Sequence, residues 1–92
     1  MRIRVVYYGQ IRQITGKEDE FIELPAGAPA YNIILKVVEQ YGDEIGWLLL
    51  TKQGIPRRSV IFAVNDVAID PGLADALEDE DILSILPAVS GG

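Results

Sequence analysis

Cysteine and histidine are both absent from the 92 residues of this chain. The lack of cysteine excludes disulfides and thiol chemistry within the chain, and it is compatible with a cytoplasmic protein. Without either residue, the chain also lacks a common general base, a common nucleophile and the soft metal ligands. We therefore expect no metal site, no bound cofactor and no catalytic groups of the chain's own.

Long apolar runs and positive charge are scarce as well. No apolar run approaches the roughly 20 residues that a membrane span requires, and the first residues lack the pattern of a signal peptide. The 8 basic residues are outnumbered by 14 acidic ones, which gives a net charge of −6. Since a nucleic-acid binder shows a basic surface, we expect neither nucleic acid nor a membrane as a partner. An acidic protein suits docking on a basic surface of another protein.

The residues that are present indicate one small α+β domain. Alternating apolar residues, or short apolar runs between turn residues, predict strands at 2–8, 21–24, 59–65, 67–69 and 82–86. Apolar residues at i, i+3, i+4 and i+7 predict one main helix over residues 30–41. The buried stripe expected on this helix consists of Tyr31, Ile34, Leu35, Val38 and Tyr41. Shorter helical segments are expected at 10–16, 43–50 and 73–77. One main helix packed on a mixed sheet of about five strands is an α+β roll.

The last six residues differ in character from the rest. We expect residues 1–86 to form the domain and residues 87–92 to form a flexible tail. Pro87 is expected to end the last strand, because its fixed φ and missing N–H do not suit the interior of a sheet. Gly91 and Gly92 have no Cβ atoms, so this end is thin enough to enter a narrow channel and present its carboxylate to another protein. The alternative interpretation is a frayed terminus made of small residues.

Two charged clusters have both a functional and a structural interpretation. Five acids lie between Asp75 and Asp81 without the residue spacing of a calcium loop. They form either a docking patch or, more simply, a solvated turn. Lys52, Arg57 and Arg58 form the one basic cluster of the sequence. It either binds phosphate or an acidic partner, or keeps the edge of the following strand soluble.

Several segments, taken in order, resemble a known family. They are an opening strand with a helical turn behind it, the segment before the main helix, a later strand and the C-terminal end: Ile3–Gly16, Glu23–Ala28, Phe62–Asn65 and Leu86–Gly92. The end is the most specific, since Leu-Pro-Ala-Val-Ser-Gly-Gly is close to the family's Pro-Pro-Val-Ser/Thr-Gly-Gly. Over its whole length the chain is similar to the ubiquitin-like sulfur carriers, most closely to the small subunits of molybdopterin synthase (MoaD-like proteins).

Two positions depart from the family's pattern. Ala88 stands where the family usually has a second proline. Glu80 stands where the family usually has the glycine of an Asp-Gly-Asp turn, although Asp79 and Asp81 match that turn. Neither change touches the terminal glycine pair.

The resemblance implies a ubiquitin-like β-grasp roll that works with partner proteins. An E1-like adenylating enzyme would use ATP to activate the Gly92 carboxylate, and a sulfur donor would convert it to a thiocarboxylate. The large subunit of molybdopterin synthase would then receive the tail and take the sulfur for molybdenum cofactor biosynthesis. This chain would be the non-catalytic, sulfur-donating subunit, and a side chain at Gly91 would block entry of the tail.

The residues expected to contact partners lie in the tail and on the sheet: Pro87, Val89, Ser90, Val6, Tyr8 and Phe62. Three alternatives remain open at this point. The tail could form isopeptide bonds as a ubiquitin-like protein modifier. The sulfur could instead serve thiamine thiazole synthesis, tRNA thiolation or a tungsten-type pterin. The chain could also be a plain interaction module in which the glycines have no chemical role.

Overall fold

Five strands form one mixed sheet in the computed structural model, which describes residues 1–73 and 76–88. In sheet order the strands are β2 (Asp19–Glu23), β1 (Arg2–Tyr7), β5 (Ile82–Pro87), β3 (Val60–Val64) and β4 (Val67–Ile69). β1 and β5 are parallel, and the other neighbouring pairs are antiparallel. The structure thus confirms the predicted α+β roll with a five-stranded sheet.

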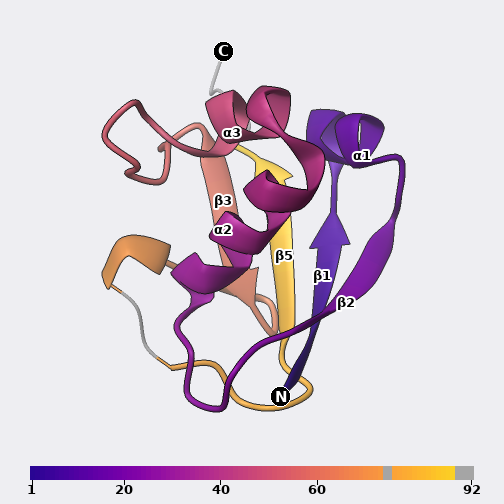
Figure 1. The fold of residues 1–92 in the computed structure, drawn as a ribbon, viewed down its shortest axis with the longest axis vertical. Coiled ribbons are helices and arrows are strands. Elements are labelled where there is room, and N and C mark those ends of the chain that lie inside the picture. Colours follow the sequence, from indigo (N-terminus) through magenta and orange to yellow (C-terminus); the bar gives the residue numbers. More distant parts are fainter. Residues whose placement is uncertain (74–75, 89–92) are drawn as a thin grey trace.

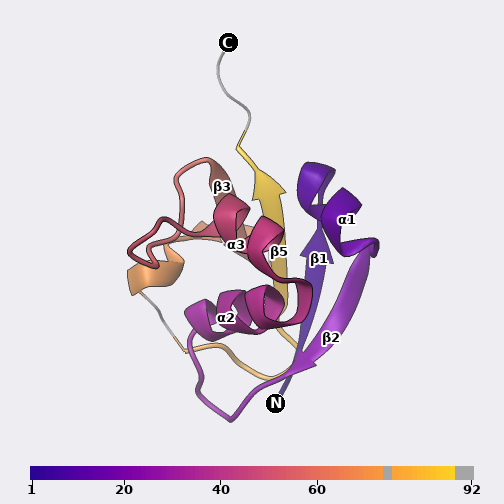
Figure 2. The same cartoon turned by 45° about the horizontal axis from the view of Figure 1, so that its top comes forward.

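The strand nearest the C-terminus, β5, occupies the middle of the sheet (Figure 1). On one side Ile82 lies opposite Arg4 of β1, and on the other side Leu83 lies opposite Val64 of β3. The strand points toward the end of the sheet at which two short helices lie, α1 (Gly9–Thr15) and α3 (Asp43–Leu49) (Figure 2). A central strand is bonded on both edges, so it gives the segment that follows it a firmly held starting point.

One face of the sheet is covered by the main helix, α2 (Ala30–Tyr41), whose bounds are those predicted (Figures 1 and 2). The helix begins after Pro29, whose backbone is extended, and ends where the Gly42 N–H donates a hydrogen bond of 2.8 Å to Val38 O. Between α2 and the sheet lies the apolar core, to which the sheet contributes Ile3, Val5, Tyr7, Phe62, Leu83 and Ile85. Burying each large apolar side chain of this kind contributes about 1.5–3 kcal/mol.

The predicted stripe on α2 is confirmed except at Leu35: Ile34 is buried, and Tyr31, Val38 and Tyr41 are partly buried against the core. The helix buries Ala30, Ile33, Ile34 and Val37, whereas Leu35 is 47% exposed. Both sets of positions fit the helical spacing, so periodicity alone does not distinguish them. The four buried positions carry aliphatic side chains that need no polar partner, and they are the ones that face the core.

The tyrosines of α2 lie at the margin of the core because their hydroxyl groups have polar partners there. Tyr31 donates to the carbonyl of Gly54, and Tyr41 donates to Glu20. A buried tyrosine ordinarily needs such a partner for its hydroxyl. Half-burial of Tyr31 and Tyr41 therefore accompanies full burial of Ile33, Ile34 and Val37 between them.

The shorter helical segments are confirmed in two cases and misplaced in the third. α1 ends at Gly16, whose φ of +72° is the left-handed conformation that glycine adopts readily at a helix end. The turn predicted at 73–77 is wrong in position: a 3-10 helix spans Pro71–Leu73, and Ala76 pairs with Pro29 in an isolated bridge. The Asp70 carboxylate accepts a 2.9 Å hydrogen bond from the Gly72 N–H, which starts the turn earlier than apolar spacing suggests.

Residues 78–81 of the acidic segment form a structured turn in which acidic side chains accept hydrogen bonds within the fold, whereas Asp75 lies outside the described residues. Asp79 accepts a hydrogen bond of 2.7 Å from the Arg2 N–H. Asp81 accepts one of 2.8 Å from the Glu78 N–H through one oxygen, and one of 2.9 Å from the Asn65 side-chain amide through the other. Glu80 has φ of +70°, a backbone conformation that favours glycine. The glycine usual in the family at this position suits the same conformation.

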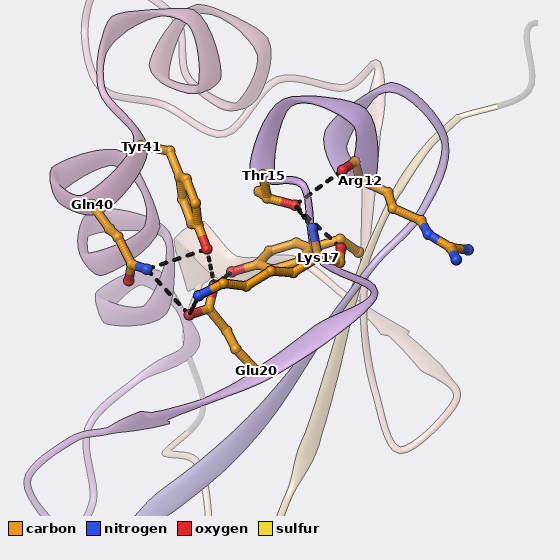
Figure 3. A network of polar contacts seen from close by, with 7 residues as sticks. Arg12, Thr15, Lys17, Glu20, Gln40 and Tyr41 are labelled. Atoms are coloured by element: carbon orange, nitrogen blue, oxygen red, sulfur yellow. Dashed lines mark hydrogen bonds and ion pairs between the residues drawn. The ribbon is translucent and has the colours of Figure 1, made fainter.

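A cluster around Glu20 joins β1, β2 and α2 (Figure 3). The Tyr7 hydroxyl donates a 2.6 Å hydrogen bond to Glu20 Oε2, and the Tyr41 hydroxyl donates to the same oxygen. Glu20 Oε1 lies 3.3 Å from Gln40 Nε2 and 3.4 Å from Lys17 Nζ. The rings of Tyr7 and Tyr41 meet edge to face at 6.2 Å between centroids, a favourable arrangement. We call these five residues the Glu20 cluster.

Within the cluster the pKa values are displaced in directions that follow from burial and pairing. Burial raises the pKa of Tyr7, and its hydrogen bond to Glu20 raises it further. Burial alone would also raise the pKa of Glu20, but hydrogen bonds from Tyr41 and Tyr7 and the charge of Lys17 outweigh it and lower the pKa. Glu20 is therefore held as a carboxylate at neutral pH.

Among the described residues, no helix has both the length and the apolar character to cross a membrane.

Candidate functional site

The described part of the tail is anchored by its first two residues. Pro87 lies in β5 opposite Val60 of β3, and the Ala88 N–H donates a hydrogen bond of 2.8 Å to the Ser59 carbonyl. The strand therefore runs one residue beyond its expected end at 86. The residues predicted to carry the chemistry or enter a partner, Val89, Ser90, Gly91 and Gly92, lie outside the described residues.

Pro87 fits inside the sheet because its position requires no N–H on the β3 side. In an antiparallel pair, hydrogen-bonded and non-hydrogen-bonded residue pairs alternate. The Ala88–Ser59 pair is hydrogen-bonded, so the preceding Pro87–Val60 pair is not. The strand does end at Pro87, as expected, but the proline is its last paired residue and does not lie beyond the pairing.

Ala88 makes a bond that the family's usual proline has no N–H to make. Its hydrogen bond to Ser59 fastens the backbone immediately before the undescribed segment. A second proline would restrict φ at this position, whereas alanine is restrained by pairing instead. At this position the hydrogen bond of Ala88 thus takes the place of the fixed φ that a proline would supply.

Gly9 approaches the tail closely from the other side. It follows β1 with φ of +56°, and a Cβ placed on it would come within 2.8 Å of Pro87 Cγ. Real Cβ atoms do not approach another heavy atom so closely, so any larger residue would have to displace the proline ring. Gly9, Ser59, Pro87 and Ala88 together form what we call the tail root.

Beside the tail root, the face of the sheet opposite α2 is lined by small and apolar side chains. One row across four strands is Val6, Ser84, Ala63 and Ala68, each paired with its neighbour in register. A second row, nearer the tail, is Tyr8, Leu86 and Ile61; the Tyr8 N–H donates to Ile85 O, and Ile61 pairs with Leu86. Tyr8 is 45% exposed and Ile61 is 37% exposed. An exposed sheet face made mostly of apolar side chains is typical of a protein-binding surface.

The sequence-based candidates on the sheet fall on different faces. Val6 and Tyr8 belong to the apolar face just described, whereas Phe62 is 2% exposed and packs in the core. Phe62 therefore supports the sheet from within and does not present its side chain to a partner. The strand alternation places Ile61, and not Phe62, on the partner-accessible side.

Four residues of this region were missed by reasoning from the sequence: Gly9, Ser59, Ile61 and Leu86. For Ile61 and Leu86 the signal was available, because alternation within each strand assigns the face once one buried residue is known. For Gly9 and Ser59 there was none. Their role depends on contacts with Pro87 and Ala88, which are distant in sequence.

This arrangement is suited to presenting the C-terminal segment to another protein. The part of the chain that the structure describes contains no group of three or more His, Cys, Asp or Glu side chains placed to hold a metal ion. What it does contain is a rigid central strand, a restrained tail root and an apolar face around it. Such a body can bind another protein and hold a short segment in a defined direction.

Curated relatives align with this chain in sequence over their full length. The chain is 26% identical to the molybdopterin synthase sulfur carrier subunit of Chlamydomonas reinhardtii over 94 residues, which covers all of both chains. It is 23% identical to small archaeal modifier protein 3 of Haloferax volcanii over 92 residues, again covering all of both chains.

Solved structures agree with the fold. The crystal structure of SAMP1 from Haloferax volcanii superposes with a TM-score of 0.87 over all of both chains, at 16% identity. At this identity the likeness establishes the ubiquitin-like β-grasp fold and nothing finer. The model of the ThiS family matches residues 5–92, which is nearly the whole chain. The chain therefore belongs to the ThiS family and is a member of the ubiquitin-like sulfur carriers.

Proposed function

We propose that this protein carries sulfur as a thiocarboxylate on Gly92 and donates it as the small subunit of a molybdopterin synthase. The observation that carries the proposal is the tail root, which fastens the Leu86-Pro87-Ala88 segment to the middle of the sheet directly before the Gly-Gly end. The full-length likeness to a molybdopterin synthase sulfur carrier subunit supports this acceptor.

The chemistry of activation explains why the chain needs no catalytic groups of its own. A carboxylate is a poor electrophile, so an E1-like enzyme would transfer AMP from ATP to the Gly92 carboxylate, with release of pyrophosphate. A sulfur nucleophile from the donor would attack the acyl carbon and displace AMP. The product would be a thiocarboxylate at Gly92, and the enzyme would supply the groups that stabilise each transition state.

Transfer would then take place in the large synthase subunit. The apolar face formed by Val6, Tyr8, Leu86 and Ile61 would bind partner surface, while the tail entered its active site. Only a chain without side chains at its last two positions passes through a narrow channel. The proposed partner contacts of Pro87, Val89 and Ser90 belong to this inserted segment.

Protein modification is the second candidate, favoured by the likeness to a small archaeal modifier protein. Both functions begin with the same adenylated C-terminus, and they differ in the attacking group. Sulfur gives a thiocarboxylate, whereas a lysine amine gives an isopeptide bond. Covalent adducts of this chain on other proteins in cells would favour modification.

The deciding experiment is intact mass spectrometry after incubation with the E1-like enzyme, ATP and a sulfur source. We expect a mass gain equal to replacement of one oxygen by sulfur, and no gain for a variant that lacks Gly92. A second step adds the large synthase subunit and the pterin precursor, and we expect the gained mass to be lost. No gain in the presence of an enzyme that activates its own carrier would contradict the proposal.

A further inference from the structure

A groove of about 540 Å³ lies beside the tail root, between β3 and the loop that precedes it. Its walls are the 55–58 loop, the first half of β3, the end of β4 and the 3-10 helix at Pro71–Leu73. The loop and the 3-10 helix lie on the same side of the molecule in both views (Figures 1 and 2). We call this feature the basic groove, because Arg57 and Arg58 line it.

The groove exists because β3 is longer than its neighbour. β4 pairs with β3 only as far as Phe62, so Val60 and Ile61 extend past the end of β4. On that side the Val60 N–H bonds back to the Arg57 carbonyl at 3.2 Å. Apolar side chains from three segments line the space, namely Ile55, Ile61 and Ile69, and Ile55 is 59% exposed.

The cations at this groove differ from most others in the protein. Arg2, Arg4, Arg12 and Lys17 each form an ion pair with a carboxylate of the fold. Within the described ranges, the Arg57 and Arg58 side chains have no carboxylate within 4.0 Å. Arg57 donates a 2.6 Å hydrogen bond to the Trp47 carbonyl, which fixes its position and leaves its charge uncompensated. Two positive charges without an ion pair thus line the groove of a protein whose net charge is −6.

The groove is continuous with the tail root. Val60, one of its lining residues, lies opposite Pro87 in the sheet, and Ser59 beside it accepts the hydrogen bond of Ala88. Any protein that takes in the tail must therefore come within reach of the groove. Asp70 is the one acid among the lining residues, and one of its oxygens is bonded to the Gly72 N–H.

We propose that the basic groove receives an acidic segment with an apolar side chain, presented by the activating enzyme beside the channel that takes in the tail. This inference rests on the proposed function and adds the chemistry of the partner surface. The arginines would pair with carboxylates of the partner, and Ile55 and Ile61 would cover its apolar side chain. An acidic carrier is repelled by an acidic partner at long range, and a local basic groove orients the approach tail first.

The test compares two charge reversals that change the net charge of the protein by the same amount. Arg58→Glu reverses a charge in the groove, and Lys36→Glu reverses an exposed charge on α2, away from the tail root. The measurement is the rate of tail activation by the E1-like enzyme as a function of carrier concentration. We expect Arg58→Glu to raise KM about tenfold with kcat nearly unchanged, and Lys36→Glu to leave both close to the wild type.

Salt and a milder pair of variants sharpen the test. The KM of the wild type should rise with ionic strength, because salt screens the attraction between the groove and the partner's carboxylates. The KM of Arg58→Glu should rise less, because this variant has lost the attraction that Arg58 provides. Arg58→Gln should give a smaller effect in the same direction, and Ile55→Ser should raise KM by an amount that salt does not change. Circular dichroism would verify that each variant is folded.

The outcomes separate this inference from the function on which it rests. If the wild type is activated and Arg58→Glu behaves like Lys36→Glu, the groove is not the contact and the inference is overturned. A fall in kcat without a change in KM also overturns it, since the groove would then act after docking. If the enzyme never activates the wild type, the proposed function is contradicted, and the inference about the groove falls with it.

Discussion

Two charged regions of this chain, the Glu20 cluster and the loop from Lys52 to Arg58, use their charges in opposite ways. In the Glu20 cluster, one carboxylate receives hydrogen bonds or an ion pair from four side chains of the fold. In the loop from Lys52 to Arg58, three cations lie together with no carboxylate of the described chain in ion-pair range. Both regions concentrate charge, but only the first pairs it within the fold.

The difference indicates which region stabilises the fold and which is left for binding. A half-buried carboxylate that satisfies two tyrosine hydroxyls cannot be removed without leaving those groups unpaired. Cations that form no ion pair contribute little electrostatic stability, and their charge remains available to another molecule. Removing a charge that is paired within the fold should therefore lower the free energy of unfolding. Removing a charge that has no ion pair should instead weaken binding to a partner.

The largest effect is expected for Glu20→Ala. The Tyr7 side chain is almost completely buried, so this variant leaves its hydroxyl without an acceptor, and we expect the free energy of unfolding to fall by about 3 kcal/mol. Chemical denaturation measures this value. Glu39→Ala, which removes an exposed glutamate of α2, is the control and should change stability by less than about 0.5 kcal/mol. Equal effects of the two variants would show that the pairing of Glu20 does not stabilise the fold.

Acid provides a second measurement on the same carboxylate. The pKa of Glu20 is lower in the folded protein than in the unfolded chain, because hydrogen bonds and Lys17 outweigh the effect of burial. Its contribution is therefore complete above the unfolded pKa of about 4.3, and it is lost as the pH falls through the lower folded value. The difference in stability between wild type and Glu20→Gln should shrink over that acidic range, and a constant difference would exclude this origin.

Gly9→Ala should have the next largest effect, of about 2 kcal/mol. About half would come from the left-handed backbone of Gly9 and the rest from crowding of the Pro87 ring. Gly16→Ala is a matched control, because Gly16 has φ of +72° and open space where the Cβ would lie. Hydrogen exchange should show faster exchange of the Ala88 N–H in Gly9→Ala only. Unchanged exchange would mean that Gly9 does not help to hold the tail root.

The smallest effect is expected at Glu80, in the turn whose acids bond to the fold. Glu80→Gly and Glu80→Ala both remove the exposed ion pair with Arg2, but only glycine relieves the φ of +70°. We expect Glu80→Gly to be the more stable of the two by about 0.5 to 1 kcal/mol, measured by thermal unfolding. If the two variants unfold alike, the turn is not strained by its side chain.

Much of this fold follows from local patterns in the sequence. Alternation predicted β1, a short apolar run predicted β3, and helical spacing predicted α2 with its observed bounds. On α2 the predicted face was wrong at Leu35 and missed the buried Ile33 and Val37, because two overlapping sets of positions share the same period. Only the tyrosine hydroxyl partners, Gly54 and Glu20, decide between them. Those partners lie in other elements, so no local pattern reveals them.

The candidate site was accessible to sequence reasoning only in part. The Gly-Gly end and the apolar character of Val6 and Tyr8 can be recognised from the sequence alone. The tail root and the basic groove cannot, because each forms from segments that meet only in the folded chain. Lys52, Arg57 and Arg58 already form a cluster along the sequence, and the fold adds that Ser59, the residue after Arg58, is hydrogen-bonded to Ala88.

The central place of β5 has a consequence for the synthesis of this protein. Arg4 lies opposite Ile82, 78 positions later (82 − 4), and β3 cannot join the sheet to β1 until β5 lies between them. A growing chain on the ribosome therefore cannot close its core while β5 is still within the exit tunnel. Pairings of such sequence separation also fold slowly, on the order of milliseconds to seconds. The fold thus makes tail presentation depend on completed folding, so an activating enzyme that requires the tail root would leave unfinished chains unmodified.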